Sequence, residues 1–122
     1  MDARSIARLQ SLGRLVVGAG LIGVPGSLAG GWVGGVADKR EGQTLAIAVG
    51  ARDVALALGA LSALRAGKGA GPWVRAGMLA DAADLVATLR ARDSLPPPAV
   101  PAVVVLAGGS LLLGAWLQSA AD

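Results

Sequence analysis

Four apolar segments separated by short polar breaks run along the chain. They cover approximately residues 6–28, 43–64, 73–90 and 98–118. A helix needs about 20 predominantly apolar residues to cross the hydrocarbon core of a bilayer, and each segment is near that length. The pattern therefore predicts an all-α fold, a polytopic membrane protein with a four-transmembrane-helix bundle that forms one domain over residues 1–122.

The four segments differ in how strongly they predict a membrane span. Residues 100–117 carry no charge and give the strongest indication, whereas residues 73–89 contain Arg75, Asp81 and Asp84. In the first segment, Pro25-Gly26 signals a turn at which the helix kinks or ends. A cleaved signal peptide would also combine basic and apolar residues, but the three later segments favour a retained span.

The composition supports a membrane location and excludes several chemistries. Hydrophobic residues make up 54% of the chain and charged residues 16%, whereas soluble domains carry about 25% charged residues. The mean hydropathy is +0.63. The chain has no Cys and no His, so a thiolate metal site, a Cys nucleophile and an imidazole base are all excluded. We expect no cofactor and no metal site.

The positive charge of the chain is placed as in membrane proteins. The formal net charge is +3, and the basic residues lie mostly at the ends of apolar segments without interleaved aromatic residues, which argues against nucleic-acid binding. Basic residues on the side of the N-terminus and second loop are Arg4, Arg8, Arg65, Lys68 and Arg75; those of the first and third loops are Lys39, Arg40, Arg90 and Arg92. This small bias predicts a multi-pass protein of the cell membrane with both termini in the cytoplasm.

Charged residues inside the apolar segments are the candidate functional residues. Arg52 and Asp53 lie at the middle of the second segment, Asp81 and Asp84 lie on one face of the third, and Arg14 lies near mid-depth in the first. A central Arg or Asp costs roughly 2.5 to 3.5 kcal/mol on insertion, so such residues face the bundle interior and find partners there.

This set of two guanidiniums and three carboxylates predicts a ligand or ion network. Two acids would pair with Arg14 and Arg52, and the third would have no cation, so that it is protonated or binds an ion or a ligand amine. Asp81, Asp84 and Asp53 are then the candidates for acid–base catalysis. The alternative is a structural network that sets helix order and register.

Glycines are spaced for close helix packing. Gly30 and Gly34, and likewise Gly31 and Gly35, match the GxxxG pattern of helix contacts. In so glycine-rich a chain, this pattern favours close packing within the molecule over a dedicated dimer face.

Three runs of sequence resemble a family of small four-helix bacterial membrane proteins related to the DoxX-like group. The runs are GRLVVGAGLIGVPGSL, GARDVALALGALSALRAG and PWVRAGMLADAADLVATL, within roughly residues 12–92. The matching positions are Gly13-Arg14, Gly50-Ala51-Arg52-Asp53 with Gly59, and Asp81 and Asp84. The resemblance implies a four-helix membrane bundle with a G-x-R-D motif in its second helix, and it implies no reaction or cofactor.

Three functions fit these features. The first is an accessory, scaffold or assembly protein that contacts a second copy or another membrane protein, because little of the chain lies outside the bilayer. The second is an intramembrane acid–base enzyme for a lipophilic substrate, with Asp81 or Asp84 as acid or base and Arg52 as electrostatic partner. The third is a small proton-coupled transporter. It ranks last because its substrate would need aromatic contacts, and the three Trp residues are all placed like interface anchors.

Overall fold

Five α-helices and two short 3-10 helices form within residues 1–121. The computed structural model describes the backbone of residues 1–121 and the side chains of residues 1–120. The elements are α1 (Ala3–Gly23), α2 (Pro25–Val33), η1 (Gly34–Asp38), α3 (Arg40–Arg65), α4 (Gly71–Arg90), η2 (Arg92–Ser94) and α5 (Ala99–Ala121). The predicted all-α class is confirmed.

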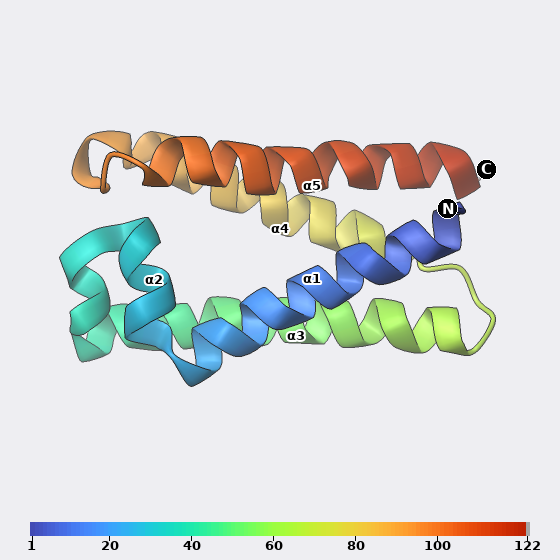
Figure 1. Cartoon of the computed structure of the whole chain (residues 1–122), viewed down its shortest axis with the longest axis horizontal. Coiled ribbons are helices and arrows are strands. Elements are labelled where there is room, and N and C mark those ends of the chain that lie inside the picture. Colours follow the sequence, from blue (N-terminus) through green and yellow to red (C-terminus); the bar gives the residue numbers. More distant parts are fainter. Residues whose placement is uncertain (122) are drawn as a thin grey trace.

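Two helices occupy the segment 6–28, for which the sequence predicts one helix that kinks or ends at Pro25-Gly26. α1 ends at Gly23 and α2 begins at Pro25, and the axis turns by 107° between α1 and the segment Pro25–Asp38. Proline lacks a backbone N–H and its ring restricts the preceding residue, so it breaks one helix and suits the first turn of the next. The Pro25-Gly26 turn signal thus marks the break correctly, but α2 then runs across the bundle (Figure 1).

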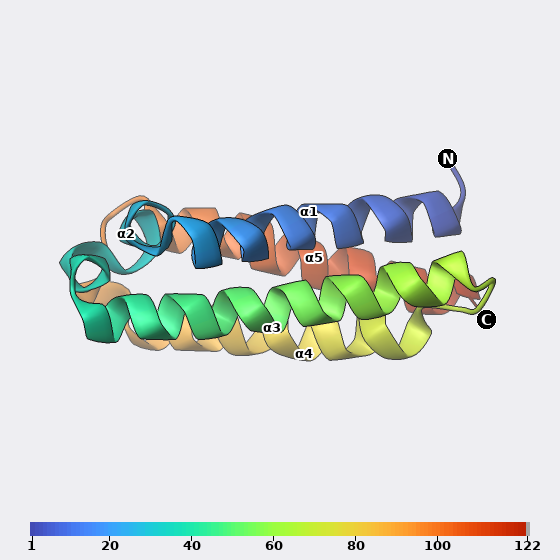
Figure 2. The same ribbon diagram turned by 90° about the horizontal axis from the view of Figure 1, so that it is seen from below.

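The four long helices lie side by side as two pairs, α1 on α3 and α4 on α5 (Figures 1 and 2). The start of α1, the loop between α3 and α4, and the last turns of α5 lie at one end of the molecule, here called the terminal end. The opposite end, here called the α2 end, holds α2, η1 and the connection between α4 and α5. Residues at the middle of each long helix therefore lie at similar depth.

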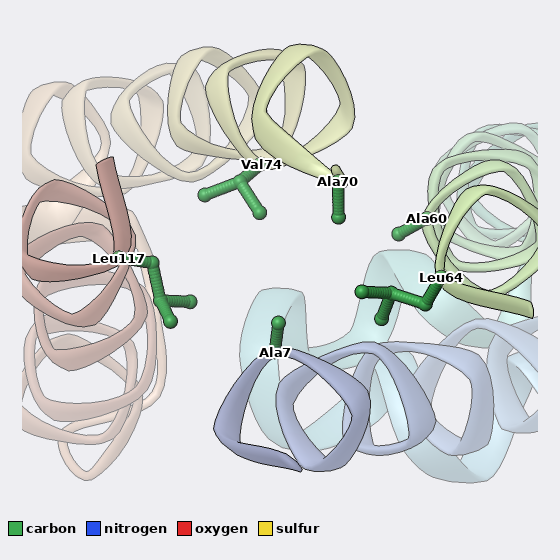
Figure 3. Packing of buried hydrophobic residues seen from close by; sticks show 6 residues of the cluster. All are labelled: Ala7, Ala60, Leu64, Ala70, Val74 and Leu117. Carbon is green, nitrogen blue, oxygen red and sulfur yellow. The ribbon is translucent and has the colours of Figure 1, made fainter. Parts of the chain in front are cut away.

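The apolar core is split between the two ends. At the terminal end, side chains from all four long helices point toward one another: Ala7, Ala60, Leu64, Ala70, Val74 and Leu117 (Figure 3). At the α2 end, the buried cluster joins α1, α2, η1 and α3 through Leu21, Ala29, Ala37 and Ala46. Leu117 of α5 belongs to the first cluster, whereas the buried residues of the second cluster come from α1, α2, η1 and α3. The middle of the bundle, between these clusters, is where the charged residues lie.

α1 and α3 touch through their backbones at two glycines. A Cβ atom on Gly18 would lie 2.7 Å from the carbonyl oxygen of Gly50, and a Cβ on Gly50 would lie 2.6 Å from the carbonyl oxygen of Gly18. Only residues without a side chain allow so close an approach. Arg14 precedes Gly18 by one turn on α1, and Asp53 follows Gly50 by about one turn on α3, so this contact sets the two charged residues against each other.

The GxxxG interpretation is wrong for contacts within the described chain. Gly34 has a φ of +74° and follows the last residue of α2, so the two glycine pairs do not lie along one helix face. Cβ atoms on Gly30, Gly31 and Gly35 would meet no atom within 4 Å. The close glycine contact between helices lies on α1 and α3 instead.

Two helices are long and apolar enough to cross a membrane, judged by length and composition over the described residues. These are α3 and α5, with mean hydropathies of 1.6 and 2.0 over their best windows. The bent pair of Ala3–Gly23 and Pro25–Asp38 adds a third if it counts as one span. The predicted membrane character is thus supported for two or three spans.

Candidate functional site

Arg14 joins three helices at the centre of the bundle. From α1, its Nη1 donates to Oδ1 of Asp53 on α3 at 3.3 Å, and its Nη2 donates to Oδ2 of Asp81 on α4 at 2.7 Å. Its side chain is 12% exposed. A Cβ on Gly77 would lie 3.1 Å from Nη2, so this glycine of α4 makes room for the guanidinium. The structure places the Arg14 side chain inside the bundle.

Arg52 joins α3 to α4. Its Nη1 and Nη2 donate to the two carboxylate oxygens of Asp84 at 2.8 and 2.7 Å, the paired geometry in which Arg binds carboxylates best. Nε and Nη2 also donate to Oδ1 of the adjacent Asp53 at 3.2 and 3.0 Å. The Arg52 side chain is 31% exposed, so it lies closer to the surface of the bundle than Arg14.

The five charged residues therefore meet, as the sequence predicts, but their pairing differs. One acid was expected to lack a cation, and this is wrong, because Asp53 Oδ1 accepts hydrogen bonds from both Arg14 and Arg52. Asp81 and Asp84 each have one guanidinium partner. With all five groups ionised the network carries a formal charge of −1, and this charge is shared rather than confined to one unpaired acid.

Two carboxylate oxygens of the network remain available as acceptors. Among the described side chains, none donates to Oδ2 of Asp53 or to Oδ1 of Asp81. Every fully enclosed polar side-chain atom in the described part of the chain has a partner, so these two oxygens are not sealed from the space around them. By contrast, both oxygens of Asp84 bind Arg52.

A cavity of about 640 Å³ lies between α1 and α5, with the three carboxylates among its lining residues. Leu28, Gly31 and Trp32 of α2 line it at the α2 end. Arg14 also lines it, and its remaining walls are mostly Gly, Ala, Val and Leu residues of α1 and α5. Small-molecule sites commonly enclose 300 to 1,000 Å³ behind mostly apolar walls with a few polar groups, so this cavity has the size and character of a ligand site.

Gln10 and Ser110 join α1 to α5 beside this cavity. Nε2 of Gln10 donates to the carbonyl oxygen and the hydroxyl of Ser110, both at 3.1 Å, and Nη2 of Arg14 lies 3.4 Å from the same hydroxyl. Sequence reasoning missed both residues. The available signal was that Ser110 is the one hydroxyl residue in the apolar run 99–117, and that Gln10 precedes Arg14 by one turn.

Trp32 ties α2 to α4. Its Nε1 donates to the hydroxyl of Thr88 at 2.9 Å, and that hydroxyl donates to the carbonyl oxygen of Asp84 at 2.7 Å. The sequence pattern is typical of an interface anchor at Trp32, whereas the structure places its ring at the cavity. This aromatic residue therefore lies where it can contact a ligand.

The charged residues do not form a metal site. Within the described part of the chain, no group of three His, Cys, Asp or Glu side chains is placed to hold a metal ion.

No protein-family model, curated protein or solved structure matches this chain. The resemblance to the DoxX-like group stays a prediction. The charged network and the cavity are therefore the features that indicate a function.

Proposed function

We propose that this chain is a four-span membrane protein that binds a lipophilic ligand in the cavity between α1 and α5. The cavity is the observation that carries the proposal, because it combines apolar walls with a polar floor at the middle of the bundle. The scaffold or assembly role that ranks first from the sequence requires no such space. Catalysis by Asp81, Asp84 or Asp53 and proton-coupled transport each begin with ligand binding, and both stay predictions.

Four spans require that α4 also crosses the bilayer. α4 has 20 residues, which gives a length of about 30 Å, close to the thickness of the hydrocarbon core. Its central carboxylates have guanidinium partners on α1 and α3, which lowers the cost of placing them in lipid. In this arrangement α1 crosses by itself, and α2 lies across the α2 end.

Single cysteines test this topology, because the chain has none of its own. We expect Lys39→Cys and Ser94→Cys to react with a membrane-impermeant maleimide in intact cells, and Lys68→Cys to react only after permeabilisation. All three positions are exposed in loops or at helix ends. Reaction of positions 68 and 94 from the same side would show that α4 does not cross. Reaction of position 68 alone in intact cells would reverse the predicted orientation.

Filling the cavity tests the ligand-binding role. Gly109 lines the cavity, whereas the adjacent Gly108 does not, and a Cβ at either position would meet no atom within 4 Å. The probe is a long-chain alkyl alcohol carrying a diazirine, and the readout is the labelled residues found by mass spectrometry. We expect labelling of cavity residues on α5 to fall about tenfold in Gly109→Leu, because the new side chain occupies the ligand space.

Gly108→Leu is the matched control and should retain the labelling of the parent protein. Labelling spread evenly over the outer face of α5, with no response to Gly109→Leu, would contradict the ligand-binding role. That outcome would leave the scaffold role as the better explanation.

A further inference from the structure

The charge of the network favours a positively charged ligand group. Three carboxylates face two guanidiniums, so the ionised network has one negative charge in excess. An uncompensated charge surrounded by apolar groups is costly, and a single ligand cation would balance it.

The guanidiniums of the network bind mainly its own carboxylates. Both Nη atoms of Arg14 and all three nitrogens of Arg52 already donate to carboxylates. An anionic group would also meet the three carboxylates at short range, and their excess negative charge would repel it.

The carboxylates of the network lie at the cavity together with Arg14. Asp53 and Asp81 both line it, their side chains are 8% and 9% exposed, and each has one oxygen that accepts no hydrogen bond from the described residues. Both carboxylates bind the same guanidinium, through Nη1 and Nη2 of Arg14, so they lie next to each other. A primary ammonium group has three N–H donors, enough for a hydrogen bond to each of the two carboxylates.

We propose that the cavity binds a lipophilic amine, with its ammonium group held by Asp53 Oδ2 and Asp81 Oδ1 and its alkyl chain lying between α1 and α5. This proposal rests on the ligand-binding function proposed above. It assigns the class of ligand and separates Asp53 and Asp81, which bind it, from Asp84, both of whose oxygens already accept hydrogen bonds from Arg52.

Three photoreactive probes with the same alkyl chain and diazirine test the proposal. Their head groups are a primary amine, an alcohol and a carboxylic acid, and the protein is placed in nanodiscs of zwitterionic lipid. The readout is labelling at the cavity-lining Val103 and Leu113 divided by labelling at Val105 and Leu112, which are 70% and 72% exposed on the same helix. This ratio corrects for unequal partition of the probes into the bilayer.

We expect the ratio to be about tenfold higher for the amine than for the alcohol, and lowest for the acid. Equal ratios for amine and alcohol would overturn the amine subsite and leave ligand binding intact, with a proton balancing the network instead. A preference for the acid would also overturn it, with Arg14 as the binding group. Cavity labelling by none of the three probes would overturn the proposed function itself.

Two variants of α4 locate the subsite. Asp81→Asn should abolish the preference for the amine. Asp84→Asn should retain more of this preference, because it removes the same charge from a carboxylate whose two oxygens already accept hydrogen bonds from Arg52. An equal loss in both variants would overturn the assignment to Asp81. If either variant does not fold, the comparison of the three head groups in the parent protein decides the proposal.

Discussion

The two sides of α1 use the same residue type in opposite ways. Toward α3, Gly18 lies against Gly50 so closely that a Cβ on either residue would overlap the backbone of the other helix. Toward α5, Gly13 and Gly109 line the cavity, and a Cβ on either would meet no atom within 4 Å. Glycine brings two helices into contact on one side and leaves space on the other.

This difference explains how a charged network can be both held in place and open. The contact between α1 and α3 positions Arg14 beside Asp53, and Arg14 then reaches Asp81 on α4. On the opposite side, α5 is held by its packing on α4 and by the apolar cluster at the terminal end. The side of α1 that packs on α3, here called the closed side, therefore fixes the carboxylates. They face the cavity on the side toward α5, here called the open side.

The largest expected effect comes from a substitution that forces α1 and α3 apart. Gly18→Leu should cost more than about 3 kcal/mol of unfolding free energy, because its side chain cannot fit against the backbone of α3. Gly13→Leu, on the open side of the same helix, should change this free energy little. Unfolding by SDS titration in bicelles measures both. Similar losses in the two variants would show that the sides do not differ.

The two arginines provide the second prediction. Arg14→Met should cost about 3 kcal/mol of unfolding free energy, because it leaves Asp81 buried without a cation. Arg52→Met should cost less, because the acid that it leaves without a cation, Asp84, is 20% exposed, whereas Asp81 is 9% exposed. The same titration tests this order, and a larger loss for Arg52→Met would contradict it.

The charged centre was predictable because membrane burial leaves charged residues few alternatives. Mid-segment positions in the first three apolar segments predict that Arg14, Arg52, Asp53, Asp81 and Asp84 meet, and the structure confirms this. The sharing of Asp53 by two guanidiniums was not predictable, because it depends on side-chain directions that only the packed helices determine. Whether these residues bind a ligand stays a prediction.

The cavity and the direction of α2 could not be predicted from the sequence, for a different reason. Cavity-lining residues such as Gly109 belong to an apolar run in which they look the same as their neighbours, including Gly108. Pro25 indicates that a helix breaks but does not indicate the direction in which the next one leaves. In both cases the decisive contacts join residues far apart in the chain.

The smallest expected effect concerns the hydrogen bond that joins α2 to α4 at the cavity. Trp32→Phe should lower the free energy of unfolding by about 1 kcal/mol. The variant loses the hydrogen bond from Nε1 to Thr88 but keeps an aromatic ring at the cavity. Trp116→Phe is the control, since Trp116 is 46% exposed on α5 and its side chain makes no hydrogen bond to the described residues. Hydrogen exchange should quicken in α2 for Trp32→Phe alone, and unchanged exchange there would mean that the apolar cluster around Ala29 suffices to hold α2 in place.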